Sequence, residues 1–184
     1  MPNMTLSATE LEQIYDQVRA QETTLAAAAE PYELDDIAAM IVGTRATLRG
    51  QIAELPDAAF EPQAADAEGN DVWSAGEIIT HCNSALVSIG GRAFGLLDVT
   101  WEDADGAVAE YTEVRPLDRA GALAALDAVD LDAFLATVPA DADLTVVGEP
   151  NPRFGEVPAK GWLMFIAIHE ADHVGQYQEM AELG

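Results

Sequence analysis

The sequence predicts an all-α protein, a four-helix bundle with an additional N-terminal helix. Apolar residues recur every three or four positions through several long segments, which is the spacing of amphipathic helices. Prolines and capping residues delimit these segments. The one β-prone run, residues 144–147, is very short. A chain of 184 residues has the size of one domain, so we expect a single domain over 1–184 with its bundle at about 34–183.

The N-terminal helix lies outside this bundle. Ser7 and Glu10 have the spacing of a capping box, and apolar residues follow at helical spacing. Pro31 ends the pattern because a proline cannot continue a helix. Residues 1–30 are therefore expected to form an extension built around a helix over 8–29.

The bundle helices are delimited by the same kinds of signal. Ser74 and Glu77 form a second capping box, and Trp73 just before it can pack on Ile78 as a hydrophobic staple. The expected bundle helices cover residues 34–54, 74–97, 118–137 and 158–182.

Three connections join these helices. Residues 56–72 are rich in loop-forming residues and are expected to form a loop. Residues 98–117 are acidic and irregular, and their length indicates a crossover or a functional loop. Residues 139–157 contain the short β-prone run and give only a weak indication of a small hairpin.

The charge balance is strongly acidic. Lys and Arg total 8 against 33 Asp and Glu, which gives a net charge of −25 at pH 7. Such a surface repels phosphate backbones and anionic lipids, so we expect neither nucleic acid nor a membrane as a partner. The acidity is explained either by solubility or by adaptation to high salt, where screening weakens the repulsion between acidic groups.

The remaining composition indicates a cytoplasmic protein. Cys82 is the only cysteine, which rules out an internal disulfide and fits a reducing compartment. The first residues lack the basic and apolar segments of a signal peptide. No apolar run approaches the roughly 18 residues that a membrane-spanning helix needs.

The three histidines are the strongest chemical signal. His169 and His173 lie four positions apart on the last helix, so their side chains share one face. His81 lies on the inward face of another predicted helix. Bundles build metal sites between facing helices, and three histidines leave a coordination position for water or substrate. The alternative is that the histidines only pack in the core.

The sequence His-Glu-x-x-His at 169–173 is also the signature of zinc peptidases, with Glu170 as the base. Only residues 174–184 follow, so we expect no distant glutamate ligand. Gln176 and Glu179 stand where the extended motif has Gly and His. We therefore do not expect a peptidase.

The two halves of the histidine pattern together resemble the DinB/YfiT-like superfamily of metal-binding four-helix bundles. The resemblance is carried by Trp73-Ser74-x-x-Glu77-Ile78-x-x-His81 and by His169-x-x-x-His173-x-x-Gln176. It implies that His81, His169 and His173 bind a divalent ion such as zinc or nickel, and that the helices run up, down, down and up. It also implies frequent homodimers. Members with assigned activity include bacillithiol S-transferases and mycothiol-dependent maleylpyruvate isomerases.

The sequence departs from the family in specific places. Members often carry a second histidine just before the last ligand, where this chain has Asp172. We expect no counterpart of the further C-terminal domain of the isomerases, and the helix over 8–29 is additional. These departures weaken any named reaction but not the fold or the metal.

Two residues near the histidines are weak catalytic candidates. Gln176 can hydrogen-bond a metal-bound water, and an amide satisfied within the core is an equal alternative. Glu77 can support His81 one turn later, although its place in a capping box explains it without chemistry.

Other residues near the histidines are expected to play no part. Glu170 and Asp172 are predicted to face solvent, because each is rotated about 100° from a histidine on the helix. Cys82 is predicted to be a small buried hydrophobe, and Trp73 and Trp162 to be core residues. Arginines that face the site can hold the carboxylates of a thiol cofactor; the candidates are Arg45, Arg49, Arg92, Arg115, Arg119 and Arg153.

Taken together, these residues favour a metal-dependent thiol S-transferase or hydrolase that acts on a small-molecule electrophile, with a low-molecular-weight thiol as a second cofactor. The alternative is a non-catalytic bundle protein in which the ion has a structural or sensing role. An exchangeable fourth position favours catalysis, and a closed one favours structure.

Overall fold

A computed structural model describes residues 5–64, 72–102, 106 and 108–182 of the chain. Its described part is all-α, as the sequence predicts. The helices are α1 (Ala8–Arg19), α2 (Leu25–Ala29), α3 (Leu34–Glu54), α4 (Ala75–Leu97), α5 (Arg119–Asp127), α6 (Leu131–Ala136) and α7 (Ala159–Glu182), with short 3-10 turns η1 (Asp57–Phe60) and η3 (Ala109–Tyr111).

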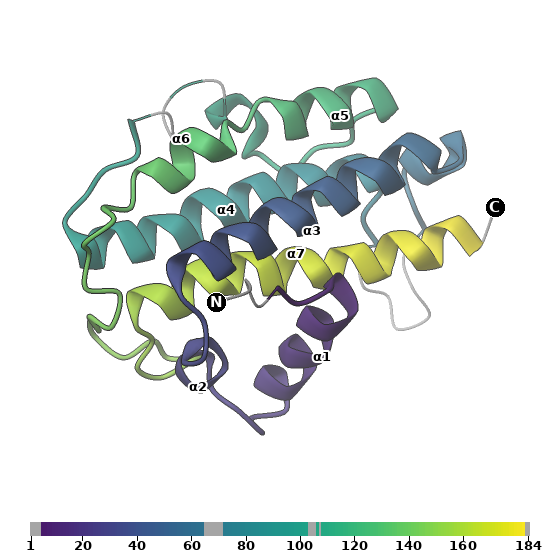
Figure 1. Ribbon diagram of the computed structural model, residues 1–184. Helices are drawn as coiled ribbons and strands as arrows, with labels where there is room; N and C mark the ends of the chain where they lie inside the picture. Colours follow the sequence, from purple (N-terminus) through teal and green to yellow (C-terminus); the bar gives the residue numbers. More distant parts are fainter. Residues whose placement is uncertain (1–4, 65–71, 103–105, 107, 183–184) are drawn as a thin grey trace.

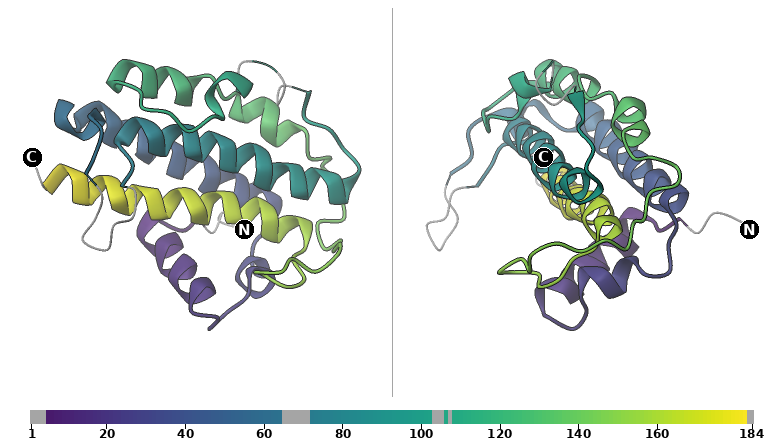
Figure 2. Two further views of the ribbon diagram at one scale, coloured as in Figure 1. Left: turned by 180° about the vertical axis from the view of Figure 1, so that it is seen from behind. Right: turned by 90° about the vertical axis from the view of Figure 1, so that its left-hand side faces the viewer.

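The four-helix bundle is formed by α3, α4, α7 and the pair α5 and α6. Helix α7 packs between α3 and α4, and α5 packs on the other side of the same two helices. Figure 1 shows α3 and α7 running in one direction, and α4, α5 and α6 running in the other. The views in Figure 2 show the same layering. This is the up-down-down-up order that was expected from the resemblance.

The additional N-terminal segment covers α7. Helices α1 and α2 both pack against α7, and α1 also reaches α3. The Glu12 side chain of α1 lies close over Gly175 of α7, where a Cβ atom would be 2.5 Å from its carboxylate. With α1, α3 and α4 around it, α7 has neighbours on several sides over the same turns.

Capping residues define the starts of the long helices. Ser7 caps α1 and Ser74 caps α4, each in a complete capping box with the predicted glutamate. The boundaries of α3, α4 and α7 lie within one residue of the predicted ones. Strong periodicity combined with capping signals explains this agreement.

Two predicted helices are instead broken in two. The helix expected over 8–29 is interrupted where Gln21 takes a left-handed backbone (φ 60°) and Thr24 caps α2 by accepting from Ala27 N. The helix expected over 118–137 is interrupted where Asp130 caps α6 by accepting from Ala133 N. In both places a short polar side chain offers the backbone a new helix start.

The connection over 98–117 is a crossover that makes α5 parallel to α4 (Figure 1). Residues 103–105 and 107 lie outside the described part. Its end is fixed against α4: Arg115 N donates to Thr80 Oγ1 at 3.0 Å, and a Cβ atom at Gly76 would lie 2.2 Å from Leu117 O. The loop therefore packs tightly on the first turns of α4, next to His81.

The weakly indicated hairpin in 139–157 is not formed as strands. Its described residues contain only isolated bridges, between Val147 and Pro158 and between Asn151 and Gly155. The segment instead caps α7, because Val146 O accepts from Ala159 N at 3.0 Å. None of the helices in the described ranges has the length and apolar character to span a membrane.

Candidate metal centre

The structure brings the three histidines together. His81 projects from α4 and His169 and His173 from α7, and one ring nitrogen from each lies within 4.8 Å of the others. The ring centroids are 4.7–5.1 Å apart. The two helices supply the site because α4 packs directly along α7. The predicted juxtaposition of residues 88 positions apart is confirmed.

Two of the three donors have the spacing of nitrogens that share one divalent ion. Two imidazole nitrogens that each lie about 2.0–2.1 Å from an ion are about 2.9–3.4 Å apart, depending on the coordination geometry. The Nε2 atoms of His81 and His169 are 3.1 Å apart. His173 Nε2 is buried and has no hydrogen-bond partner in the described part of the protein. A buried ring nitrogen without a partner is costly unless a ligand satisfies it.

Gln176 orients one of the three rings. Its Oε1 atom lies 3.0 Å from His173 Nδ1, which makes Nδ1 the donor and leaves His173 Nε2 as the free acceptor. A metal-binding histidine commonly donates its other N–H group in this way. The Gln176 side-chain amide therefore contacts the His173 ring directly.

Burial keeps all three histidines neutral at pH 7. It lowers the pKa of His81 to about 4, with a smaller contribution from His173. It lowers the pKa of His169 to about 3, followed by the effects of His173, His81 and Arg153. The pKa of His173 is also lowered by burial, although the bond to Gln176 opposes the shift. Neutral imidazoles are the form that binds a metal ion.

Glu77 has a structural role in this arrangement. Its Oε2 atom accepts from Ser74 N and from Ser74 Oγ, both at 2.8 Å. The carboxylate thus completes the cap of α4, the reading that the sequence favoured.

The predicted exposure of Glu170 is wrong. Its side chain is 1% exposed and forms a salt bridge with Arg45 of α3, which is also buried. Arg45 also donates to Asn83 Oδ1 at 2.7 Å, and Asn83 donates to Ala125 O of α5 at 2.8 Å. The prediction assumed that α7 has a solvent face at this point, but α3 packs over it. The glutamate of the peptidase-like motif is held by an arginine in the bundle interior.

The predicted exposure of Asp172 is also wrong, because α1 packs over that side of α7. The side chain is partly buried. Burial raises the pKa of Asp172, Arg19 lowers it, and Asp16 and Glu179 raise it further. Asp172 thus belongs to an acidic contact between α1 and α7.

The two tryptophans differ. Trp162 is buried at 6% exposure, as predicted. Trp73 was expected in the core but is 36% exposed, and its ring lies 4.6 Å from that of His81. It precedes the first turn of α4, at the edge of the helix packing, and therefore covers His81. Cys82 is fully buried, as predicted, and burial raises the pKa of its thiol well above the ordinary value.

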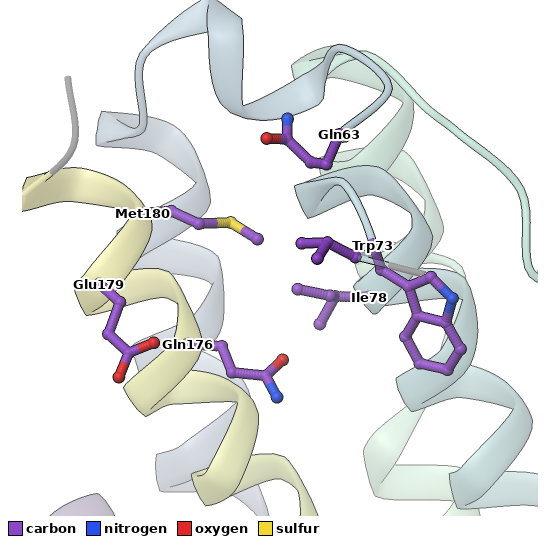
Figure 3. A pocket seen from close by; sticks show the side chains of 7 residues that line it. Gln63, Trp73, Ile78, Gln176, Glu179 and Met180 are labelled. Carbon is purple, nitrogen blue, oxygen red and sulfur yellow. The ribbon is translucent and has the colours of Figure 1, made fainter. Parts of the chain in front are cut away.

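Pockets lie on two sides of the histidines. One, of about 370 Å³, is lined by His81 and His169 together with Tyr15, Ser84, Ala85, Ser88, Ile89, Arg153, Phe154 and Phe165. The other, of about 470 Å³, is lined by Gln63, Val72, Trp73, Ile78, Gln176, Glu179 and Met180. Figure 3 shows Met180 and Gln176 of α7 facing Ile78 of α4 across this second pocket. The first, which we call the histidine pocket, is the one that reaches the rings of His81 and His169.

Sequence reasoning missed Tyr15 and the polar contacts of Arg45 and Glu170. Tyr15 belongs to the N-terminal extension, and no spacing in the sequence relates it to the histidines. Arg45 was among the arginines considered, and its place within the apolar pattern of 34–54 was a signal that it points inward.

Comparison with known proteins identifies one family. A family model described as the DinB superfamily matches residues 40–177, more than half of the 184 residues. The match includes all three histidines and excludes α1 and α2. No curated protein and no solved structure matched the chain significantly.

Proposed function

The chain belongs to the DinB superfamily, and on that premise we propose that it is a metal-dependent enzyme, a thiol S-transferase or a hydrolase of a small electrophile. In this proposal His81, His169 and His173 bind the ion. The observation that carries it is the convergence of three neutral imidazoles, two of which, His81 and His169, line a pocket.

The chemistry of the donor set supports zinc or nickel. Imidazole nitrogen suits zinc, copper, iron and nickel, whereas magnesium and calcium prefer oxygen. In the described chain the group of possible ligands contains three histidines and no carboxylate or thiolate. Three protein ligands leave a position for an exogenous group, the arrangement of reactive rather than structural zinc sites.

Each neighbouring residue has a defined part in this proposal. A bound divalent ion lowers the pKa of a thiol or water towards neutrality and so supplies the nucleophile. Gln176 fixes the tautomer and orientation of the His173 ring. Trp73 packs over His81 and restricts access of water from that side. The described walls of the histidine pocket contain no carboxylate, so we assign no general base.

Metal analysis of untagged protein tests the site. We expect about one zinc or nickel ion per chain after supplementation, and less than about 0.1 in a His169→Gln variant. The variant should remain folded, because the His169 ring has a single hydrogen-bond contact in the described structure, with His81 at 3.1 Å, and its Nδ1 has none. Wild-type protein that stays below about 0.1 ion per chain would contradict the metal proposal.

A turnover screen separates the enzyme from a non-catalytic metal-binding bundle. The metal-loaded protein is assayed with low-molecular-weight thiols against chlorinated and epoxide electrophiles, and with esters and amides. The His169→Gln variant serves as the blank. Stoichiometric metal without turnover in any arm would favour the structural or sensing role.

Assembly is part of the same proposal, since we propose a homodimer. Light scattering of the metal-loaded protein gives the mass to compare with the 19.5 kDa chain.

A further inference from the structure

Arg153 lies in the histidine pocket, where it is the only basic side chain of the described lining. The pocket has a volume of about 370 Å³, which suits a small molecule. Its walls combine Ser84 and Ser88 of α4 with aromatic rings from other parts of the chain. Arg153 comes from the connection between α6 and α7.

A tight turn holds Arg153 at this position. Asn151 and Gly155 exchange two backbone hydrogen bonds, with N···O distances of 2.7 and 2.9 Å. Asn151 Oδ1 accepts from Arg153 N at 2.9 Å and from Phe154 N at 3.2 Å. Gly155 closes the turn with a left-handed backbone at φ 69°, which favours glycine.

Phe154 anchors the turn to α7. Its ring lies 4.8 Å from Phe165 and 6.0 Å from Trp162, in edge-on contacts. The guanidinium of Arg153 lies 5.1 Å from the centre of the Phe154 ring. A guanidinium over a ring keeps its in-plane N–H groups available for a carboxylate.

No acidic side chain among the described residues neutralises the charge of Arg153. The ion pairs of the described residues involve Arg45, Arg49 and Arg119, and none includes Arg153. Arg19, Arg92, Arg115 and Lys160 also form no ion pair among the described residues, so Arg153 is distinguished by its place in the pocket beside His81 and His169. An arginine so placed beside three converging imidazoles indicates an anionic ligand.

Tyr15 brings the N-terminal extension into the pocket. Its ring stacks on Phe165 at 6.4 Å, and it lines the pocket with Arg153. Burial raises the pKa of Tyr15 and Asp172 raises it further, while the charges of Arg19 and Arg153 and a side-chain hydrogen bond with Arg153 oppose the shift. Its hydroxyl thus remains a donor at neutral pH. Tyr15 lies outside residues 40–177, so this wall comes from the additional helix.

One arginine and one phenol match a monoanion. No second lysine or arginine lines the described pocket, and the net charge of −25 disfavours a dianion such as a phosphate monoester. A carboxylate accepts two parallel N–H bonds from a guanidinium.

We propose that Arg153 and Tyr15 bind a carboxylate on the small molecule that reacts at the histidines. The inference rests on the proposed function and names the substrate class: a small carboxylic acid, with the carboxylate at the Arg153 side of the pocket and the reacting atom at the histidine side.

Thiol binding to the Co²⁺-loaded protein tests this inference, through the thiolate-to-cobalt absorption band. The probes are 3-mercaptopropionate and the neutral 2-mercaptoethanol. We expect the acid to bind at least about tenfold more tightly to the wild type. Arg153→Gln should abolish this preference, and Arg153→Lys should restore part of it.

The matched control is Arg92→Gln. Arg92 also stacks on an aromatic ring, at 5.1 Å from the Trp162 centroid, but it does not line the pocket. This variant should keep the preference for the acid. Tyr15→Phe should weaken acid binding by about twofold to fivefold, because it removes a single neutral hydrogen bond. Equal binding of acid and neutral thiol, or an Arg153→Gln variant that keeps the preference, would overturn the inference.

Calorimetry on metal-free protein separates this inference from the metal proposal. Butyrate and butyramide are compared at equal concentration, and we expect Arg153-dependent binding of butyrate alone. If Co²⁺ does not bind but butyrate does, the proposed function fails and the carboxylate site stands. If Co²⁺ binds stoichiometrically but the binding of 3-mercaptopropionate and of butyrate does not depend on Arg153, the carboxylate site fails and the metal site stands.

Discussion

Two adjacent residues of α7 lie in opposite kinds of polar cluster. Glu170 points into the bundle, where Arg45 pairs with it through opposite charge and Asn83 accepts a second hydrogen bond from Arg45. His169 points towards His81 and His173, where three similar rings meet and burial keeps each of them neutral. The first cluster is buried and joins opposite charges from different helices, although Arg45 Nε and Glu170 Oε2 have no hydrogen-bond partner among the described residues. The second is only partly buried and joins groups of one kind. The difference separates a cluster that links α3 to α7 from one that fits the binding of an ion, as proposed above.

The largest expected effect on stability comes from breaking the cluster of Glu170, Arg45 and Asn83. Glu170→Ala leaves the charge of Arg45 buried without a carboxylate and should lower the free energy of unfolding by about 3–5 kcal/mol. Urea denaturation of metal-free protein measures it. The double variant Arg45→Met/Glu170→Leu should be more stable than Glu170→Ala, because it leaves no charge unpaired.

The matched control for this loss is an exposed ion pair. Arg49 and Asp127 form a salt bridge at 2.9 Å with side chains 55% and 54% exposed. Asp127→Ala should cost no more than about 1 kcal/mol. Equal losses in the two variants would show that the buried cluster has no special structural role.

An intermediate effect, on metal affinity, is expected from Gln176, which orients the His173 ring. Gln176→Leu removes the acceptor that holds His173 Nδ1–H, so the affinity for zinc or Co²⁺ should fall about 10-fold to 100-fold. A competition titration with a chromophoric chelator measures the affinity. Gln63→Leu changes the same residue type in the same pocket without touching a histidine, and it should leave the affinity unchanged. A fall in both variants would assign the effect to the pocket as a whole.

The smallest effect concerns a third side of α7, which meets α1. Burial raises the pKa of Glu12, and Asp172, Asp16 and Glu179 raise it further, so like charges face one another here. Raising KCl from 0.1 to 1 M should therefore stabilise the protein by about 1 kcal/mol. Thermal melts at both concentrations measure this gain.

Glu12→Gln should reduce that salt dependence. Glu149→Gln removes the same charge from an exposed loop and should preserve it. Identical melting at both salt concentrations would contradict the interpretation of the acidic surface as an adaptation to high salt.

The long helices and the histidine site could be predicted because their signals are local. Periodicity and capping define α3, α4 and α7, and the placement of histidines on inward faces predicts their convergence. The breaks at Thr24 and Asp130 were missed because a single capping side chain outweighs a continuing apolar pattern.

The surroundings of α7 could not be predicted in the same way. Helical angles correctly placed Glu170 and Asp172 away from the histidines, but they do not say what lies on the other sides of a helix. Helix α3 covers one of these residues and α1 the other. Tyr15 was missed for the same reason, since its position depends on how α1 packs on α7.

The crossover between α4 and α5 has a consequence for folding. Helices α4 and α7 are neighbours in space but distant in the chain. His81 and His169 therefore meet although 88 positions separate them. The proposed ion, shared by these helices, would be a reversible cross-link that closes a long loop, and it would remove far more freedom from the unfolded chain than a capping box does. It also stabilises the native state in proportion to its binding. Chelation should therefore speed amide hydrogen exchange along both helices, so metal occupancy can be followed through the backbone as well as through the ion.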